Sequence, residues 1–231
     1  DAATDTLNVV NVNELFVWTG KTFTPGGDVT IGTSNVNALT GIDIRGTWTA
    51  TGTETITNNG AWNNAGIFNA AQGTFTFDAD LQPGWDSVIA GATTFYNLAF
   101  TGTGYGWDLD DDMIVQNNFT STSTNSGNNI SAVGAETHTI SVTGNVIHSG
   151  TNNIYGAVTL VMNGTTAQTV TTSSTGSLGS LRISNTSATV ELGSDLKMNG
   201  RLTIDPSATL DVTNNNYDII LNTGVTSPSD T

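Results

Sequence analysis

The feature that most constrains the fold is an alternation of apolar and polar residues that recurs, in phase, 83 positions further along the chain. Residues 73–120 align without a gap with residues 156–203, and ten apolar positions coincide although few residues are identical. The coinciding pairs are Phe75/Val158, Phe77/Leu160, Phe95/Leu178, Leu98/Leu181, Phe100/Ile183, Trp107/Val190, Leu109/Leu192, Met113/Leu196, Val115/Met198 and Phe119/Leu202. Because alternate residues of a strand point to the same side, the pattern predicts a buried row of side chains that is copied along the chain.

A period of about 80 residues is too long for one coil of a solenoid, so we interpret it as about four coils of about 20 residues. Thr and β-branched residues favour strands, and the Gly, Asn and Ser residues between the alternating segments favour tight turns. The sequence therefore predicts an all-β fold, a β-solenoid (parallel β-helix) with internal repeats. A β-sandwich is the alternative, because it also has short alternating strands, but it explains the long period less well.

The repeats also predict the domain organisation. Residues 27–224 are expected to form a single β-solenoid domain, between an N-terminal extension at 1–26 and a C-terminal tail at 225–231. The expected copies are a partial one at about 27–72 and two fuller ones at 73–150 and 156–224.

The charge of the chain excludes one class of partner. Lys and Arg total 5 against 20 Asp and Glu, which gives a formal net charge of −15. Phosphate backbones are bound by clusters of basic residues, so we expect no nucleic-acid partner. The sequence has no Cys and no apolar run near the roughly 18 residues that a membrane span requires, so we expect no disulfides and no membrane insertion.

Four carboxylates gather in the segment "WDLDDDM": Asp108, Asp110, Asp111 and Asp112. Clustered carboxylates on a turn supply the oxygen ligands that Ca²⁺ prefers, so these four residues are the candidate metal site and Ca²⁺ is the only candidate cofactor. The aligned segment is "VELGSDL", which instead predicts a corner of the coil in which Asp112 accepts backbone hydrogen bonds as Asp195 does.

No catalytic motif is present in the sequence. The two histidines, His138 and His148, have no metal-binding or triad spacing and are expected in exposed or turn positions. We therefore predict a protein that is not an enzyme.

The strings "GATTFYNLAF", "LGSDLKMNGRLTI" and "NNGAWNNAGIF" resemble the repeats of large secreted bacterial surface proteins and adhesins with β-solenoid architecture. The resemblance covers residues 27–224 and implies an extracellular or cell-surface location. It carries over no catalytic residue, because the matching positions are core and turn residues. Adhesins bind glycans or host surfaces, and Trp62 and Trp85 are the expected sugar-stacking pair, whereas Trp48 and Trp107 are expected in the core.

Solenoids expose strand edges at both ends, and an uncovered edge is a template for another chain. The stretch "TLNVVNVNELFVW" is rich in residues that favour strands, and we predict that it pairs with a neighbouring copy or folds back as a cap. Its candidate assembly residues are Leu7, Val9, Val10, Val12, Leu15 and Val17. The expected function is a structural subunit whose partners are copies of itself and which assembles end to end into an extracellular fibre or cell-surface matrix. The alternative is an adhesin segment with a glycan or host-surface ligand.

Overall fold

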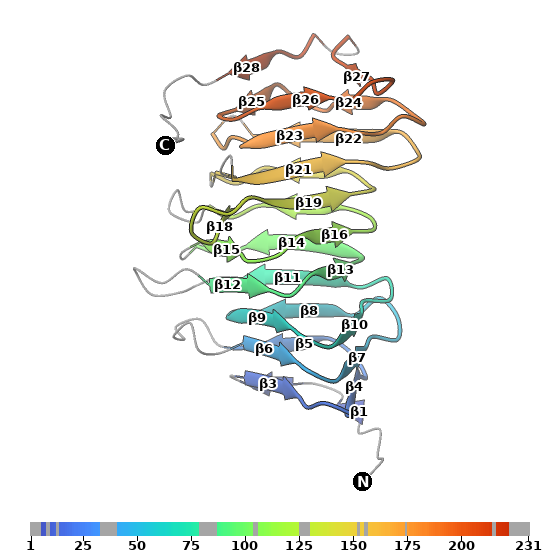
Figure 1. The fold of residues 1–231 in the computed structure, drawn as a ribbon, viewed down its shortest axis with the longest axis vertical. Helices are drawn as coiled ribbons and strands as arrows, with labels where there is room; N and C mark the ends of the chain where they lie inside the picture. Colours follow the sequence, from blue (N-terminus) through green and yellow to red (C-terminus); the bar gives the residue numbers. More distant parts are fainter. Residues whose placement is uncertain are drawn as a thin grey trace.

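The computed structural model describes residues 6–7, 10–12, 14–32, 41–78, 87–103, 106–124, 130–151, 153–154, 157–173, 175–213 and 216–221. The described chain contains 28 β-strands and no helix, and it winds into a solenoid whose coils stack along one axis (Figure 1). All strand pairs within the described residues are parallel, as between β11 (Thr74–Asp78) and β14 (Asn97–Thr101). This confirms the predicted parallel β-solenoid and excludes the β-sandwich, whose sheets are antiparallel.

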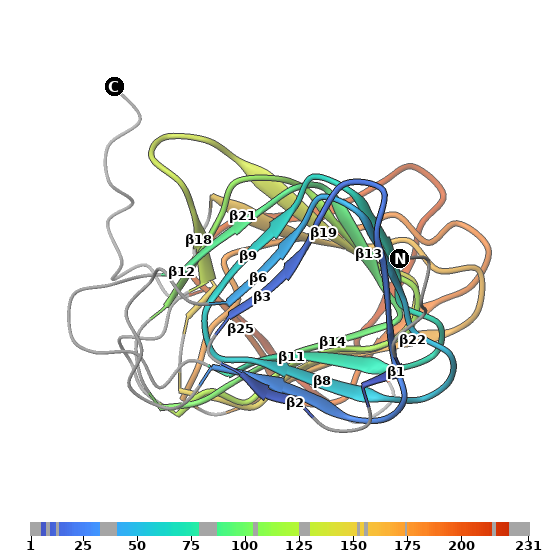
Figure 2. The same cartoon turned by 90° about the horizontal axis from the view of Figure 1, so that it is seen from below.

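Successive strands lie on successive faces, so the cross-section has three sides (Figure 2). The first face is a ten-stranded sheet of β2 (Val10–Val12), β5 (Val29–Ile31), β8 (Thr55–Asn58), β11, β14, β17 (Phe119–Ser121), β20 (Val146–His148), β22 (Gln168–Thr172), β24 (Val190–Leu192) and β27 (Leu210–Asp211). The second face holds β3 (Glu14–Val17), β6 (Gly41–Ile44), β9 (Ala61–Asn64), β12 (Ser87–Ala90), β15 (Trp107–Leu109) and β18 (Ile130–Ala132), then single bridges at Ile154 and Leu178, then β25 (Leu196–Met198) and β28 (Ile219–Leu221).

The third face consists of two sheets that meet where β10 lies against β13. Its strands are β1 (Thr6–Leu7), β4 (Thr22–Pro25), β7 (Thr47–Thr49), β10 (Ile67–Asn69), β13 (Thr93–Phe95), β16 (Met113–Val115), β19 (His138–Val142), β21 (Val158–Met162), β23 (Ser180–Ile183) and β26 (Leu202–Ile204).

The core is a continuous column of inward side chains between the three faces. Aromatic rings fill its N-terminal half, where Trp62 lies among Phe68, Phe75 and Phe95. Aliphatic residues such as Leu160 fill the C-terminal half. Trp48 and Trp107 are buried, which confirms the core positions predicted for them.

The structure does not confirm the long repeat that the alignment predicts. The residues in the ten aligned pairs are buried, except for the partly buried Leu202, so the aligned segments share their inward phase. However, the alignment carries β11 of the first face to β21 of the third, and β14 of the first face to β23 of the third. Coil length also varies. Ile56 pairs with Val29 in the preceding coil and with Phe75 in the following coil, and fewer residues separate it from Phe75 than from Val29. An alternating pattern identifies which residues point inward, but it is the same on every face.

The described residues of the N-terminal segment pair with the rest of the solenoid. β1 pairs with β4, β2 with β5 and β3 with β6, all in parallel, so within the segment expected as an extension, 1–26, β1 to β3 form the first coil and β4 begins the second. The expected C-terminal tail, like every residue from 222 onward, lies outside the described residues. Within the described chain, no helix has the length and apolar character needed to cross a membrane.

Several buried polar residues depart from the simple apolar pattern, among them His148 and Gln168. His148, expected at an exposed or turn position, has the inward phase of β20 and is fully buried. Gln168 is also buried, and its carboxamide joins several coils. Its Oε1 accepts hydrogen bonds from the Gly164 N–H (2.9 Å) and from Nδ2 of Asn185 (3.1 Å), while its Nε2 donates to the Val142 carbonyl (3.0 Å).

Candidate functional site

The acidic segment forms the corner between β15 and β16, as the alignment predicted. Leu109 and Met113, on either side, point into the core. The carboxylates turn to different coils. Asp111 accepts a hydrogen bond from the Gly91 N–H (2.7 Å) of the preceding coil, whereas Asp112 accepts one from the Thr139 N–H (2.7 Å) of the following coil. Asp108 lies outside the corner on β15 and accepts a hydrogen bond from the Ser131 hydroxyl, and Asp110 is exposed.

Asp112 occupies a position that recurs along the solenoid. At each such position, an Asp or Asn directly precedes an inward strand residue, and its side-chain oxygen accepts the N–H of the residue one coil further on. The acceptors and N–H donors are Asp28/Thr55, Asn97/Asn118, Asp112/Thr139, Asn118/Asn145, Asn145/Thr169 and Asp195/Asp218, with N···O distances from 2.7 to 3.3 Å. We call these residues the Asx ladder. Asp112 and Asp195 both accept a backbone N–H, as expected from their alignment, but the N–H comes from the following coil and not from the turn itself.

The Asx ladder predicts that two substitutions of Asp112 have different effects on the free energy of unfolding. Asp112→Ala removes the acceptor of the Thr139 N–H, and we expect the free energy of unfolding to fall by about 1 kcal/mol. Asp112→Asn keeps an Oδ1 acceptor, as Asn118 and Asn145 do natively, and should stay within a few tenths of a kcal/mol of wild type. Urea denaturation followed by circular dichroism measures both. Equal losses in the two variants would contradict a hydrogen-bonding role.

The four carboxylates of the candidate metal site are not gathered around one point. In the part of the chain that the structure describes, no group of three or more His, Cys, Asp or Glu side chains is placed to hold a metal ion. Asp108, Asp111 and Asp112 each accept a hydrogen bond from a different coil or strand. The Ca²⁺ site stays a prediction made from the sequence.

A calcium titration tests that prediction directly. From the diverging hydrogen bonds, we expect Ca²⁺ to change the melting temperature of the wild type no more than that of the Asp110→Ser/Asp111→Ser variant. A stabilisation of the wild type that saturates with Ca²⁺, and that this variant lacks, would establish a cation site at the corner.

The candidate assembly residues lie in the first coil, where their strands already pair within the chain. Leu7 is in β1, Val10 and Val12 are in β2, and Leu15 and Val17 are in β3; Val9 lies outside the described residues. Val17 is buried and Leu15 packs against the core. Strands β1, β2 and β3 are each at the edge of their sheet, with no described strand beyond them.

The opposite end of the solenoid leaves its inward row uncovered. Ile183 and Met198 are fully buried, yet their partners one coil further on, Ile204 and Leu221, are 48% and 61% exposed. The contrast arises because β26, β27 and β28 are sheet edges with no described strand beyond them. We call the surface formed by Leu202, Ile204, Leu210, Ile219 and Leu221 the C-terminal end face; its residues are partly or largely exposed.

The tryptophans do not form the expected sugar-stacking pair. Trp62 is only 1% exposed and lies in the aromatic core, so it has no face for a ligand. Trp85 lies outside the described residues. The exposed tryptophan of the described chain is Trp18, which packs against Phe16 with ring centroids 4.3 Å apart.

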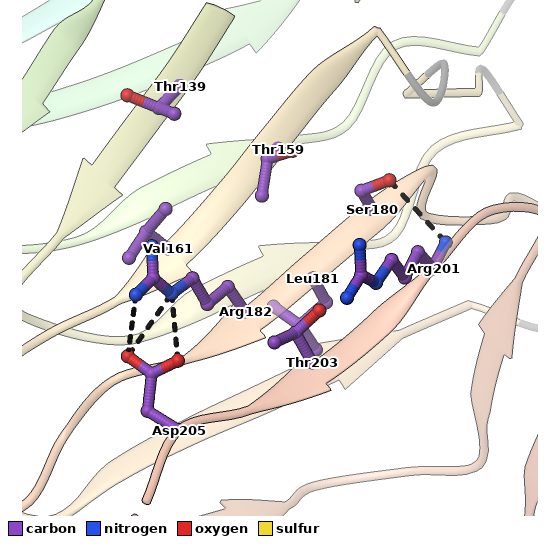
Figure 3. A pocket seen from close by; sticks show the side chains of 9 residues that line it. All are labelled: Thr139, Thr159, Val161, Ser180, Leu181, Arg182, Arg201, Thr203 and Asp205. Carbon is purple, nitrogen blue, oxygen red and sulfur yellow. Dashed lines mark hydrogen bonds and ion pairs between the residues drawn. The ribbon is translucent and has the colours of Figure 1, made fainter.

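A polar depression of about 390 Å³ lies on the outer side of the third face, over β19, β21, β23 and β26 (Figure 3). Two of the five basic residues of the chain, Arg182 and Arg201, come from neighbouring coils and line it. Asp205 holds Arg182 through hydrogen bonds of 2.9 to 3.1 Å. The hydrogen bonds from Arg182 and Ser184 lower the pKa of Asp205, and the hydrogen bond to Asp205 raises the pKa of Arg182. We call this surface the basic groove; the sequence pattern did not predict it.

No protein-family model, curated protein or solved structure matches this chain. The fold defines a parallel β-solenoid protein whose acidic corner, exposed ends and basic groove are its distinctive surface features.

Proposed function

We propose that the protein is a secreted, non-enzymatic structural subunit that assembles end to end with copies of itself into an extracellular fibre or cell-surface matrix. The observation that carries the proposal is the C-terminal end face, where side chains in the core phase are exposed to solvent. The resemblance of its repeats to those of bacterial surface proteins supports the extracellular location.

Both ends carry strand edges of the same three faces. The first coil ends the stack with β1, β2 and β3, and the last coil with β26, β27 and β28. A second copy placed on the same axis would continue each face in parallel, with its first coil covering the C-terminal end face. Such a contact joins two different surfaces and repeats at every subunit, so it propagates into a filament when it does not close.

The Asx ladder supports a further coil in the same position. Asp218 directly precedes β28, as Asp195 precedes β25 and Asp112 precedes β16. The Asp218 N–H donates a hydrogen bond to Oδ1 of Asp195 with an N···O distance of 3.0 Å. No described residue donates a hydrogen bond to the carboxylate of Asp218. A backbone N–H from the first coil of a neighbouring copy would complete the ladder.

Electron microscopy and sedimentation of the purified protein test the proposal. We expect fibres from the wild type and monomers from the variant Ile204→Lys/Leu221→Lys, because burying two lysines between subunits has a high desolvation cost. The matched control is Ile67→Lys/Ile114→Lys, which places the same charges on two exposed isoleucines of the lateral surface, and it should still form fibres. A wild type that stays monomeric at high concentration, or end-face variants that polymerise normally, would refute end-to-end assembly.

The first coil has its own test. Deleting residues 1–18 removes β1, β2 and β3 and exposes the next coil. If fibres form unchanged, the candidate assembly residues of this segment do not pair with a neighbouring copy. If fibres are lost while the circular dichroism spectrum of the remaining coils is kept, the first coil provides the contact.

The alternative function, an adhesin segment that binds glycans or a host surface, requires a ligand-binding surface. The burial of Trp62 leaves the basic groove as the best polar surface for such a role.

A further inference from the structure

The basic groove contains a row of hydroxyl groups that leads to a guanidinium group. Thr139, Thr159 and Ser180 are paired across β19, β21 and β23, so their side chains line up across neighbouring coils about 4.8 Å apart. Arg201 follows in the next coil, where its backbone N–H donates a hydrogen bond to the Ser180 hydroxyl oxygen with an N···O distance of 3.4 Å (Figure 3). The groove therefore offers hydroxyl donors and acceptors along its length and a cation at one end.

The two arginines of the groove differ in their partners. Arg182 is neutralised by Asp205, with which it forms three hydrogen bonds. Arg201 is exposed, and no described residue accepts a hydrogen bond from its guanidinium group. The groove thus has one positive charge in excess, in a chain whose net charge is −15. Charges beyond about 8 Å are largely screened at physiological ionic strength, so a bound ligand responds chiefly to this local charge.

We propose that the basic groove binds an acidic saccharide, with a carboxylate of the sugar on Arg201 and sugar hydroxyls on Thr159 and Ser180. A guanidinium group binds a carboxylate through two parallel hydrogen bonds, and Arg201 has its donors available. The row of Thr and Ser hydroxyls can form hydrogen bonds with the hydroxyl groups of a saccharide. An inorganic anion such as sulfate has no hydroxyl groups of this kind.

Isothermal titration with trigalacturonate, and with the neutral galactose trisaccharide of the same linkage, tests the proposal at about 0.15 M salt. We expect the acidic trisaccharide to bind at least tenfold more tightly than the neutral one. Arg201→Gln should weaken binding of the acidic trisaccharide at least tenfold. The matched control is Lys21→Gln, which removes the same charge at an exposed turn near the other end of the solenoid, and its affinity should be that of the wild type.

Three results would overturn the proposal. They are equal affinity for the acidic and neutral trisaccharides, wild-type affinity in Arg201→Gln, and inorganic sulfate binding as tightly as trigalacturonate. The last would mean that the hydroxyl row contributes nothing and that the groove is a simple anion site. Arg201 is exposed, so the variant should keep the circular dichroism spectrum of the wild type. The measurement does not depend on polymerisation, so its failure would leave end-to-end assembly standing.

Discussion

Replacing Trp62 by alanine should lower the free energy of unfolding by about 3–5 kcal/mol, the largest effect that we expect from a single substitution in this protein. Trp62 is 1% exposed and lies at the centre of the aromatic half of the core. Its ring contacts those of Phe75 and Phe68 edge to face, with centroids 4.7 and 5.1 Å apart, and that of Phe95 at 5.7 Å. Alanine would leave a large cavity among these rings, because stacked coils cannot close over it without shifting their strands.

The same substitution also breaks a buried hydrogen bond. Nε1 of Trp62 donates to Oγ1 of Thr93 at 3.1 Å, so the variant would leave that hydroxyl with one partner fewer. Trp18→Ala is the matched control, because Trp18 is 64% exposed and its removal should cost less than about 1 kcal/mol. Urea denaturation followed by far-ultraviolet circular dichroism compares the two. A loss below about 1 kcal/mol for Trp62→Ala would mean that this residue is not a core residue.

The second large effect is expected at Gln168. Gln168→Ala should lower the free energy of unfolding by about 2–4 kcal/mol, because it removes a hydrogen-bond partner from several buried or partly buried polar groups at once. The Gly164 N–H would lose its partner. The Val142 carbonyl would keep only the Asn163 N–H, and the Asn185 amide would lose one of its acceptors. A buried donor or acceptor without a partner costs about 1–3 kcal/mol, more than a hydrogen bond contributes when both partners face water.

Thr169→Ala is the control for Gln168→Ala, since Thr169 is the outward neighbour of Gln168 on β22 and is only partly buried. We expect it to cost less than about 1 kcal/mol. Thermal denaturation and urea titration of both variants give the comparison. Similar losses in the two variants would show that the effect reflects strand propensity and not the buried carboxamide.

The sequence was sufficient to predict what each strand does locally. Alternation identified inward residues such as Phe100 and Ile183, and the structure buries both completely. It also placed Asp110 and Asp111 at a corner, and the alignment predicted a common hydrogen-bonding role for Asp112 and Asp195. Side-chain direction and the position of the corner depend on residues within a few positions, which the local sequence encodes. The N–H groups that Asp112 and Asp195 accept, in contrast, come from the following coil.

Other features depended on how the coils stack. The alignment of the two copies paired Phe75 with Val158, but these residues lie on different faces. Alternation shows which residues point inward but not on which face they lie, and coil length varies along the chain. His148 and Gln168 have the inward phase of their strands, but their polar side chains would be expected at the surface; partners from adjacent coils allow Gln168 to be buried.

By itself, then, the sequence determined that this protein is a parallel β-solenoid and which of its residues point inward. The tertiary structure alone decided which residues from separate coils meet. Arg182 lies on β23 and Arg201 directly precedes β26, and the two share a groove because these strands are neighbours, although the chain between them passes over both other faces. Ile204 and Leu221 are exposed because no described strand follows theirs. Strand direction is a local property of the chain, whereas contacts between coils and the exposure of the ends are set by the stacking of distant segments.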